Sequence, residues 1–263
     1  MAKKRRWVIK AGSRMVCEGG PLLMRTWMQQ VAELKKKHNI EVIWVTSGAI
    51  AWAELKTSFN GHRRTLRQKQ ALSAIGQPLV MDLYNLALHA NNLLGAQVLL
   101  TAGDMRDRRR KYNLLNSLNE LLRMNVIPIL NENDAISTEQ IQFGDNDSLA
   151  SKVAILTKAE RLILLTDVDG LFDQDPKKNP KASLISYRKS LGKADVLMAD
   201  RHSKSAQGTG GMYSKLLAAK EASRTGIVTH LVRGDWPKNL LHIAEGKVLG
   251  TQVGGRFVAQ SKD

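Results

Sequence analysis

A lysine lies directly after the first short apolar run of the chain. Lys10 follows Trp7-Val8-Ile9 and comes just before Gly12. A lysine beside a glycine at the end of a strand can bring its ammonium group to a phosphate oxygen as a point charge. For a lysine taken alone, the commoner interpretation is a surface side chain whose stem covers apolar neighbours.

A glycine-rich run towards the C-terminal end of the chain contains a second lysine. Its residues are Gly208, Thr209, Gly210, Gly211, Met212, Tyr213, Ser214 and Lys215. Closely spaced glycines let backbone N–H groups approach an anion, and a helix that begins directly after them favours phosphate at its N-terminus. The glycine spacing differs from the P-loop and from the dinucleotide fingerprint. A flexible turn without a ligand is the alternative interpretation.

Two carboxylates flank an amide in the run Phe143-Gly144-Asp145-Asn146-Asp147-Ser148. At a helix start, Asp or Asn caps the first backbone N–H groups, which is the structural interpretation of this run. In the functional interpretation the amide of Asn146 contacts a substrate, and a carboxylate orients the lysines or holds a divalent cation.

Three further polar segments follow short apolar runs. They are Thr46-Ser47-Gly48, Asn131-Glu132-Asn133-Asp134 and Thr166-Asp167-Val168-Asp169-Gly170. Ordinary turns favour the same residue types, but ligands of open α/β sheets bind beyond the carboxyl ends of the strands. Together with two lysines and a glycine cradle, these segments favour phosphoryl transfer, in which positive groups and Mg²⁺ stabilise the moving phosphoryl group.

The elements that must position these segments alternate along the chain. Apolar runs predict strands at 7–9, 42–45, 97–100, 126–130, 161–165 and 229–232, and helix-like stretches cover 22–38, 77–91, 107–124, 147–156 and 212–225. The alternation predicts an α/β fold with a mostly parallel sheet and helices on both faces. Pro128 weakens the prediction for 126–130, because proline cannot donate a ladder hydrogen bond.

The composition is that of an ordinary globular protein. The chain has 263 residues, of which 43% are hydrophobic and 24% charged. No apolar run reaches the roughly 18 residues of a membrane span, and the N-terminal run is too short for a signal peptide. We therefore expect a cytoplasmic protein without membrane contact. Cys17 is the single cysteine, which excludes an internal disulfide and a cysteine-based zinc site.

The formal net charge of +16 is compatible with nucleic acid, with anionic substrates or with a generally basic proteome. Lysines and arginines are spread along the chain, and the basic patch at Arg63, Arg64, Arg67 and Lys69 has few aromatic neighbours for base stacking. A nucleic-acid-binding protein is the alternative from another class, and its binding would depend strongly on salt. Nucleic acid is not the partner we expect.

In order and spacing, the polar segments resemble those of the amino-acid-kinase family, and within it those of the glutamate 5-kinases. The resemblance runs from about residue 7 to about residue 253 and rests on the segments that begin at Lys10, Thr46, Asn131, Gly144, Leu165 and Gly208. The pair Asn-Glu-Asn-Asp and Gly-Asp-Asn-Asp is its most specific part. Trp52 lies where members usually have a glycine nearby, and the resemblance stops before the C-terminal PUA domain of many members.

The resemblance implies a three-layer αβα sandwich with a mostly parallel central sheet. It implies transfer of the γ-phosphoryl group of ATP to the side-chain carboxylate of L-glutamate, the first step of proline biosynthesis. Lys10 and Lys215 would stabilise the transferring group, and Asp147 would orient them. The residues implied for glutamate are Ser47, Asn131, Asp134, Asp145 and Asn146. The residues implied for ATP are Lys10, Thr166, Asp167, Thr209, Gly210, Gly211, Met212, Tyr213, Ser214 and Lys215.

The resemblance also carries expectations about cofactors, partners and organisation. Mg²⁺ would arrive with ATP, and no protein ligand for the metal is assigned. Proline would compete at the glutamate site, and the chain would form a homodimer or homotetramer. We expect one domain over 1–263, with about 1–150 on the amino-acid side and about 151–253 on the ATP side. A related kinase with another carboxylate or phosphate acceptor is the alternative within the same fold.

Overall fold

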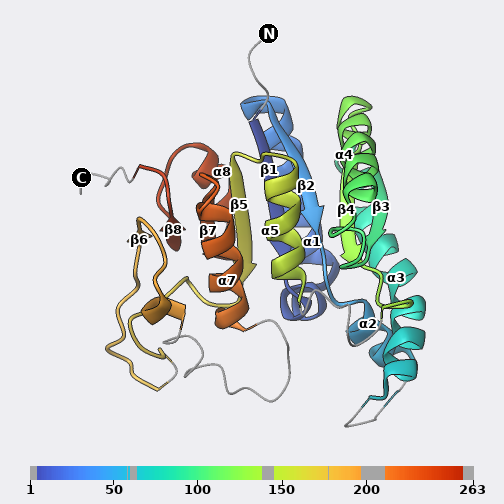
Figure 1. Ribbon diagram of the computed structural model, residues 1–263, viewed down its shortest axis with the longest axis horizontal. Coiled ribbons are helices and arrows are strands. Elements are labelled where there is room, and N and C mark those ends of the chain that lie inside the picture. Colours follow the sequence, from blue (N-terminus) through green and yellow to red (C-terminus); the bar gives the residue numbers. More distant parts are fainter. Residues whose placement is uncertain are drawn as a thin grey trace.

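Eight strands form one sheet at the centre of the molecule, in the order β3-β4-β2-β1-β5-β7-β8-β6 (Figure 1). The computed structural model describes residues 5–57, 59, 64–137, 145–176, 178–196 and 211–256. The parallel strands are β1 (Arg5–Ala11), β2 (Ile40–Val45), β3 (Gly95–Leu100), β4 (Ile127–Glu132), β5 (Arg161–Thr166) and β7 (Val228–Arg233). At one edge, β8 (Thr251–Val253) runs antiparallel to β7, and the short β6 (Tyr187–Arg188) pairs with β8.

Helices cover both faces of this sheet (Figure 1). One face packs against α1 (Ser13–His38), α3 (Leu66–His89) and α8 (Asn239–Ala244). The other face packs against α4 (Arg108–Arg123), α5 (Asn146–Leu156) and α7 (Met212–Ser223). Helix α2 (Ala49–Thr57) lies against α3. The predicted α/β sandwich with a mostly parallel sheet is confirmed.

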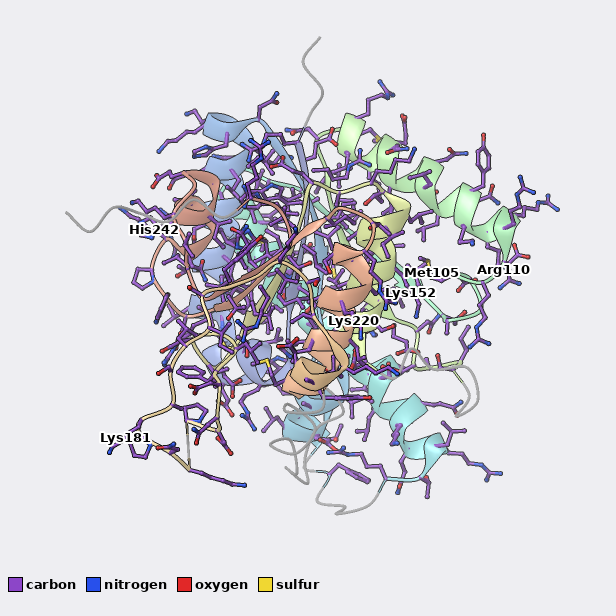
Figure 2. The ribbon with its side chains drawn as sticks, turned by 60° about the vertical axis from the view of Figure 1, so that its left-hand side comes forward. Met105, Arg110, Lys152, Lys181, Lys220 and His242 are labelled. Carbon is purple, nitrogen blue, oxygen red and sulfur yellow. The ribbon has the colours of Figure 1, made fainter. Side chains whose placement is uncertain are left out.

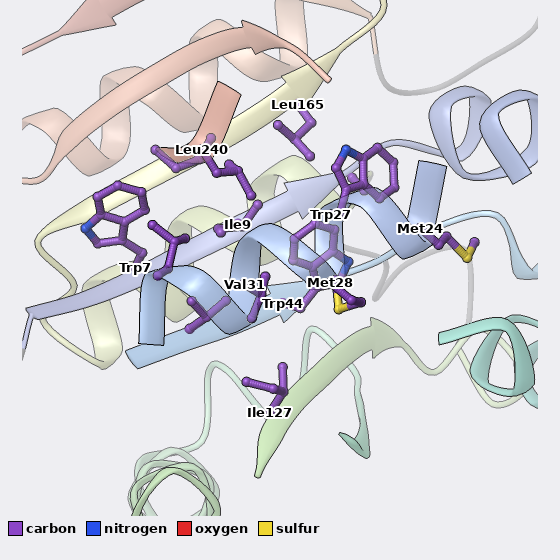
Figure 3. Close-up of a cluster of buried hydrophobic side chains, with 14 of the residues drawn as sticks. Trp7, Ile9, Met24, Trp27, Met28, Val31, Trp44, Ile127, Leu165 and Leu240 are labelled. Carbon is purple, nitrogen blue, oxygen red and sulfur yellow. The ribbon is translucent and has the colours of Figure 1, made fainter. Parts of the chain in front are cut away.

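Strand β1 shows how the sheet divides its side chains between the two layers. Trp7 and Ile9 enter the core on the α1 side, where they belong to the same buried cluster as Trp27 and Trp44 (Figure 3), whereas Val8 enters the core on the α5 side. Successive side chains of a strand point to opposite faces. Lys10 follows the same alternation and therefore points to the face that α5 and α7 cover.

Two helices begin earlier than the sequence predicts. Helix α1 begins at Ser13, but it is kinked at Gly20, which has φ +55°, before Pro21. Proline disfavours the α conformation in the residue before it, and glycine tolerates positive φ, so the predicted periodicity becomes visible only after the kink. Helix α3 begins at Leu66, where Thr65 and Gln68 form a capping box.

Pro128 lies inside β4, although a proline weakens the prediction of a strand. The carbonyl of Leu130 accepts a hydrogen bond from the N–H of Thr46, so Pro128, two residues earlier, also faces β2. The pairing of β2 with β4 begins only at Trp44 and Ile129. The missing N–H of Pro128 therefore falls just outside this ladder, where proline is tolerated.

Basic side chains lie on several elements. Figure 2 shows Arg110 on α4, Lys152 on α5 and Lys220 on α7, three helices that cover the same face of the sheet, and Lys181 between β5 and β6. Within the described ranges, no helix has the length and apolar character that a membrane crossing requires.

Candidate active site

The register of the parallel strands brings four polar segments together at the carboxyl ends of these strands. Lys10 on β1 is level with Val45 on β2 and with Leu164 on β5, and Val45 is level with Leu130 on β4. The segments that follow these positions begin at Thr46, Asn131 and Thr166. The sequence predicted that these strand ends form the site, and the structure places them on adjacent strands.

Two lysines share one buried carboxylate at this edge. Lys10 Nζ lies 2.6 Å from Oδ1 of Asp147, and Lys215 Nζ lies 3.2 Å from Oδ2. The hydroxyl of Ser214 also donates to Oδ2, at 2.8 Å. Lys10 and Lys215 are 3% and 6% exposed, and Asp147 is fully buried. The three charged groups come from β1, α5 and α7, and they form a compact cluster with two positive charges and one negative charge.

The cluster changes the ionisation of its own members. Burial alone would raise the pKa of Asp147, but the charges of Lys10 and Lys215 lower it to about 2. Burial lowers the pKa of Lys10, which Lys215 lowers further while Asp147 opposes both. Asp147 is therefore a permanent anion that orients two ammonium groups.

The amide of Asn146 joins the segments on the β2 and β4 side. Its Nδ2 atom lies 2.8 Å from the carbonyl of Thr46, 2.8 Å from the hydroxyl of Ser47 and 2.7 Å from Oδ1 of Asn131. Its Oδ1 atom is buried and has no hydrogen-bond partner among the described residues. A buried amide oxygen without a donor is costly, so this atom fits the donor group of a ligand.

Asp145 and Asp134, the two acidic residues predicted on the glutamate side, differ in their hydrogen bonds and in the charges near them. Asp145 is the N-cap of α5 and accepts from the N–H of Ser148 at 2.9 Å, which confirms the capping interpretation for this residue. Burial and the charge of Asp147 raise the pKa of Asp145. Asp134 lies after β4, and burial raises its pKa to about 6, against the opposing charge of Lys69.

The predicted ATP side is described only in part. Thr166 is buried at the end of β5, and its hydroxyl donates to Asp167 at 3.3 Å. Asp167 also forms an ion pair with Arg14 at 2.5 Å. Gly211 is the N-cap of α7, and Met212 and Tyr213 begin that helix. Thr209 and Gly210 lie outside the described residues.

Sequence reasoning missed two residues that contact the predicted site. Arg14 is exposed in the first turn of α1, and no pattern in the sequence distinguishes it from other surface arginines. Gln77 is buried in α3 and accepts a hydrogen bond from Asn131 at 3.1 Å. A signal existed for Gln77, because it interrupts the apolar stripe that contains Leu72, Val80 and Tyr84.

The carboxylates near Lys10 do not form a metal site by themselves. Within the described ranges, no three His, Cys, Asp or Glu side chains gather closely enough to hold an ion. Asp147 already binds two ammonium groups, which disfavours a cation at the same oxygens. The divalent-cation interpretation of the Asp145 and Asp147 pair is therefore not supported by the geometry of Asp147.

The sequence has many relatives among proteins of known name. The model of the amino acid kinase family matches residues 5–233. The glutamate 5-kinase of Alcanivorax borkumensis is 38% identical over 257 residues, which are 96% of this chain and 68% of that protein. The glutamate 5-kinase of Hahella chejuensis is 40% identical over 255 residues, which are 95% of this chain and 66% of that protein.

Solved structures share the fold at lower sequence identity. A carbamate kinase from Giardia lamblia bound to AMP-PNP has a TM-score of 0.65 and 16% identity, with 97% of this chain and 100% of that chain covered. At such identity the likeness establishes the fold alone. The match to the family model and the similarity to the curated relatives show that the chain belongs to the amino acid kinase family, and within it to the glutamate 5-kinases.

Proposed function

We propose that the chain transfers the γ-phosphoryl group of ATP to the side-chain carboxylate of L-glutamate and forms L-glutamyl 5-phosphate, which begins proline biosynthesis. The observation that carries this proposal is the pair of buried lysines, Lys10 and Lys215, on the two oxygens of Asp147. Asp147 holds both ammonium groups close together at the ends of the parallel strands. Two buried cations in this arrangement can stabilise the negative oxygens of a transferring phosphoryl group.

The chemistry needs little covalent participation from the protein. An oxygen of the glutamate carboxylate forms a bond to the γ-phosphorus while the bond from that phosphorus to the bridging oxygen of ADP breaks. The carboxylate is already ionised near neutral pH, so no group has to remove a proton. Lys10 and Lys215 stabilise the negative charge of the transferring group, and Asp147 holds their ammonium groups in place.

Glutamate binds on the side of β2 and β4 in this proposal. The buried Oδ1 atom of Asn146 accepts from the α-ammonium group, whose N–H bonds satisfy the orphaned acceptor. The Ser47 hydroxyl and the Asn131 amide share the opposite side of the Asn146 amide. Asp134, near the same segment, adds a negative charge that attracts the α-ammonium group.

ATP binds on the side of β5 and α7. Thr166 and Asp167 hold the nucleoside, and the N-terminus of α7, which begins after Gly211, faces the phosphates. Thr209, Gly210, Met212 and Tyr213 belong to the same proposed ATP site. Mg²⁺ supplies further positive charge on the phosphate oxygens when it arrives with ATP, as is usual for this ion.

Residues up to about 150 bind the amino acid and residues 151–253 bind ATP, within one domain. Proline, which carries the same α-amino acid group as glutamate, competes at the glutamate site. The chain acts as a homodimer or homotetramer, and it acts in the cytoplasm.

The decisive experiment measures ADP release from Mg-ATP with and without L-glutamate, in the presence of hydroxylamine to trap an acyl phosphate. We expect ADP release that depends on glutamate, with an equal amount of hydroxamate. ADP release that is instead stimulated by another carboxylate or by a phosphate monoester would replace glutamate as the acceptor while retaining the kinase chemistry.

A further inference from the structure

Two adjacent residues of α3 contact the two loops that carry the proposed acceptor-binding side chains. Gly76 packs so closely against the first turn of α2 that an added Cβ would overlap the carbonyl of Ala49, two residues after Ser47. Gln77 reaches the end of β4, where its Nε2 donates to the carbonyl of Glu132 at 3.2 Å. One turn of α3 therefore sets the position of both loops.

Gln77 also contacts a proposed binding side chain directly. It is 6% exposed, and its Oε1 accepts from Nδ2 of Asn131 at 3.1 Å. The oxygen of the Asn131 amide then faces Nδ2 of Asn146, at 2.7 Å, and the N–H of Glu132, at 3.0 Å. The two ends of an asparagine amide have nearly equal shape, so their direction is set by their hydrogen-bond partners. A turned Asn131 would place two donors against each other.

Helix α3 also supports a second oxygen that accepts a hydrogen bond from the Asn146 amide. Tyr84 lies two turns after Gln77 on the buried face of α3, and its hydroxyl binds the hydroxyl of Thr46 at 3.0 Å and Nε1 of Trp44 at 2.9 Å. The carbonyl of Thr46 accepts from Asn146 at 2.8 Å. Two of the three acceptors around Nδ2 of Asn146 are thus supported by α3.

We propose that Gln77 is a positioning residue for the acceptor substrate. It fixes the direction of the Asn131 amide, and Asn131 in turn orients Asn146. The Oδ1 atom of Asn146 then faces the acceptor substrate. This inference rests on the proposed function, because it takes the Asn146 side of the site as the glutamate side. Gln77 acts through Asn131 and Asn146 and touches neither lysine of the phosphoryl site, so its loss affects the acceptor and not ATP.

Gln70 provides a matched control on the same helix. Its Nε2 donates to the carbonyl of Ser137 at 3.1 Å, so it also ties α3 to the segment after β4. It has no hydrogen bond to Asn131 among the described residues. The same substitution at 70 and at 77 therefore removes a similar tie to the backbone, and only the substitution at 77 removes the contact with the Asn131 amide.

The test compares Gln77→Met with Gln70→Met in the hydroxylamine assay, with KM for L-glutamate, KM for ATP and kcat measured for each. We expect Gln77→Met to raise the glutamate KM by roughly tenfold, the order expected for a lost buried hydrogen bond, with an unchanged ATP KM. Gln70→Met should keep both constants. Equal glutamate constants for the two variants, or a parallel rise of both constants in Gln77→Met, would overturn the inference.

If Gln77→Met does not fold, a more conservative pair of substitutions provides the same test. Gln77→Asn keeps the amide but shortens its reach, and Gln70→Asn is its control, with circular dichroism to verify folding. The same difference in glutamate KM is expected, and its absence overturns the positioning role. Wild-type protein that releases ADP without any dependence on glutamate overturns the proposed acceptor, and the inference about Gln77 then fails with it.

Discussion

The ammonium nitrogen of Lys10 lies 2.6 Å from the carboxylate of Asp147, and the two side chains are 4% and 0% exposed. Lys10 belongs to a central strand, whereas Asp147 belongs to the first turn of α5. Salt and water screen such a pair much less than they screen a surface pair. The contact is therefore a fixed part of the site, and its removal has consequences for stability as well as for turnover.

Asp147→Asn should destabilise the fold by about 3–5 kcal/mol, because it leaves two buried ammonium groups without their counter-charge. The folded-state pKa of about 2 lies below the ordinary 3.8. The stabilisation by this carboxylate is therefore complete above pH 3.8 and is lost as the pH falls through about 2. Thermal unfolding of both proteins between pH 2 and 7 should show that this acid-dependent component is missing in the variant. Identical curves would contradict the prediction.

Lys215→Met should lower kcat by about 10²–10³-fold, the effect of removing one electrostatic contact to a transition state. Methionine keeps the apolar volume of the buried stem, so the fold should remain. Lys220→Met, on the same helix but less buried and without contact to Asp147, is the control and should keep wild-type turnover. Near-normal turnover of folded Lys215→Met protein would exclude a role of this lysine in phosphoryl transfer.

Asn146→Ala should chiefly raise the glutamate KM, because the amide joins Thr46, Ser47 and Asn131 and offers a free oxygen to the acceptor. Steady-state kinetics with either substrate varied measures this effect, and the ATP KM should stay constant. Asn113→Ala, on the exposed surface of α4, serves as the control. An unchanged glutamate KM would remove Asn146 from the acceptor site.

Glutamate binding should weaken as the pH falls from 7 to 5. Burial raises the pKa of Asp134 to about 6, so the carboxylate loses its charge within this range, and with it the attraction for the α-ammonium group of glutamate. Neither charged group at the α-carbon of glutamate titrates there. The glutamate kcat/KM of the wild type should therefore fall with an apparent pKa near 6, and Asp134→Asn should give a lower and flatter profile. A wild-type profile that is flat between pH 5 and 7 would count against Asp134.

Local patterns were sufficient to predict the ends of the six parallel strands to within two residues. Each run of buried apolar residues is followed by a polar segment, and the parallel register then places Lys10, Thr46, Asn131 and Thr166 on adjacent strands. The helix starts were harder to predict. The capping pair Thr65 and Gln68 was present in the sequence and would have indicated the start of α3.

Contacts between distant segments could not be predicted in the same way. Gln77 and Asn131 are separated by 54 positions, and periodicity says nothing about which buried polar groups meet across two elements. The pairing of Arg14 with Asp167 spans 153 positions and joins an exposed arginine to a loop. Both contacts follow from the way that α1 and α3 pack on the sheet, which depends on the whole core.

The positions of Lys10 and Lys215 in the sequence also determine when the phosphoryl site can form during synthesis of the chain. Lys10 leaves the ribosome with the first strand, whereas Lys215 belongs to α7, which emerges only after all but two of the strands. Contacts between such distant segments form late in folding, because a long loop must close first. A nascent chain therefore cannot complete its phosphoryl site before α7 has been translated. Translation products that end before α7 lack Lys215, the second of the two lysines proposed to act on ATP.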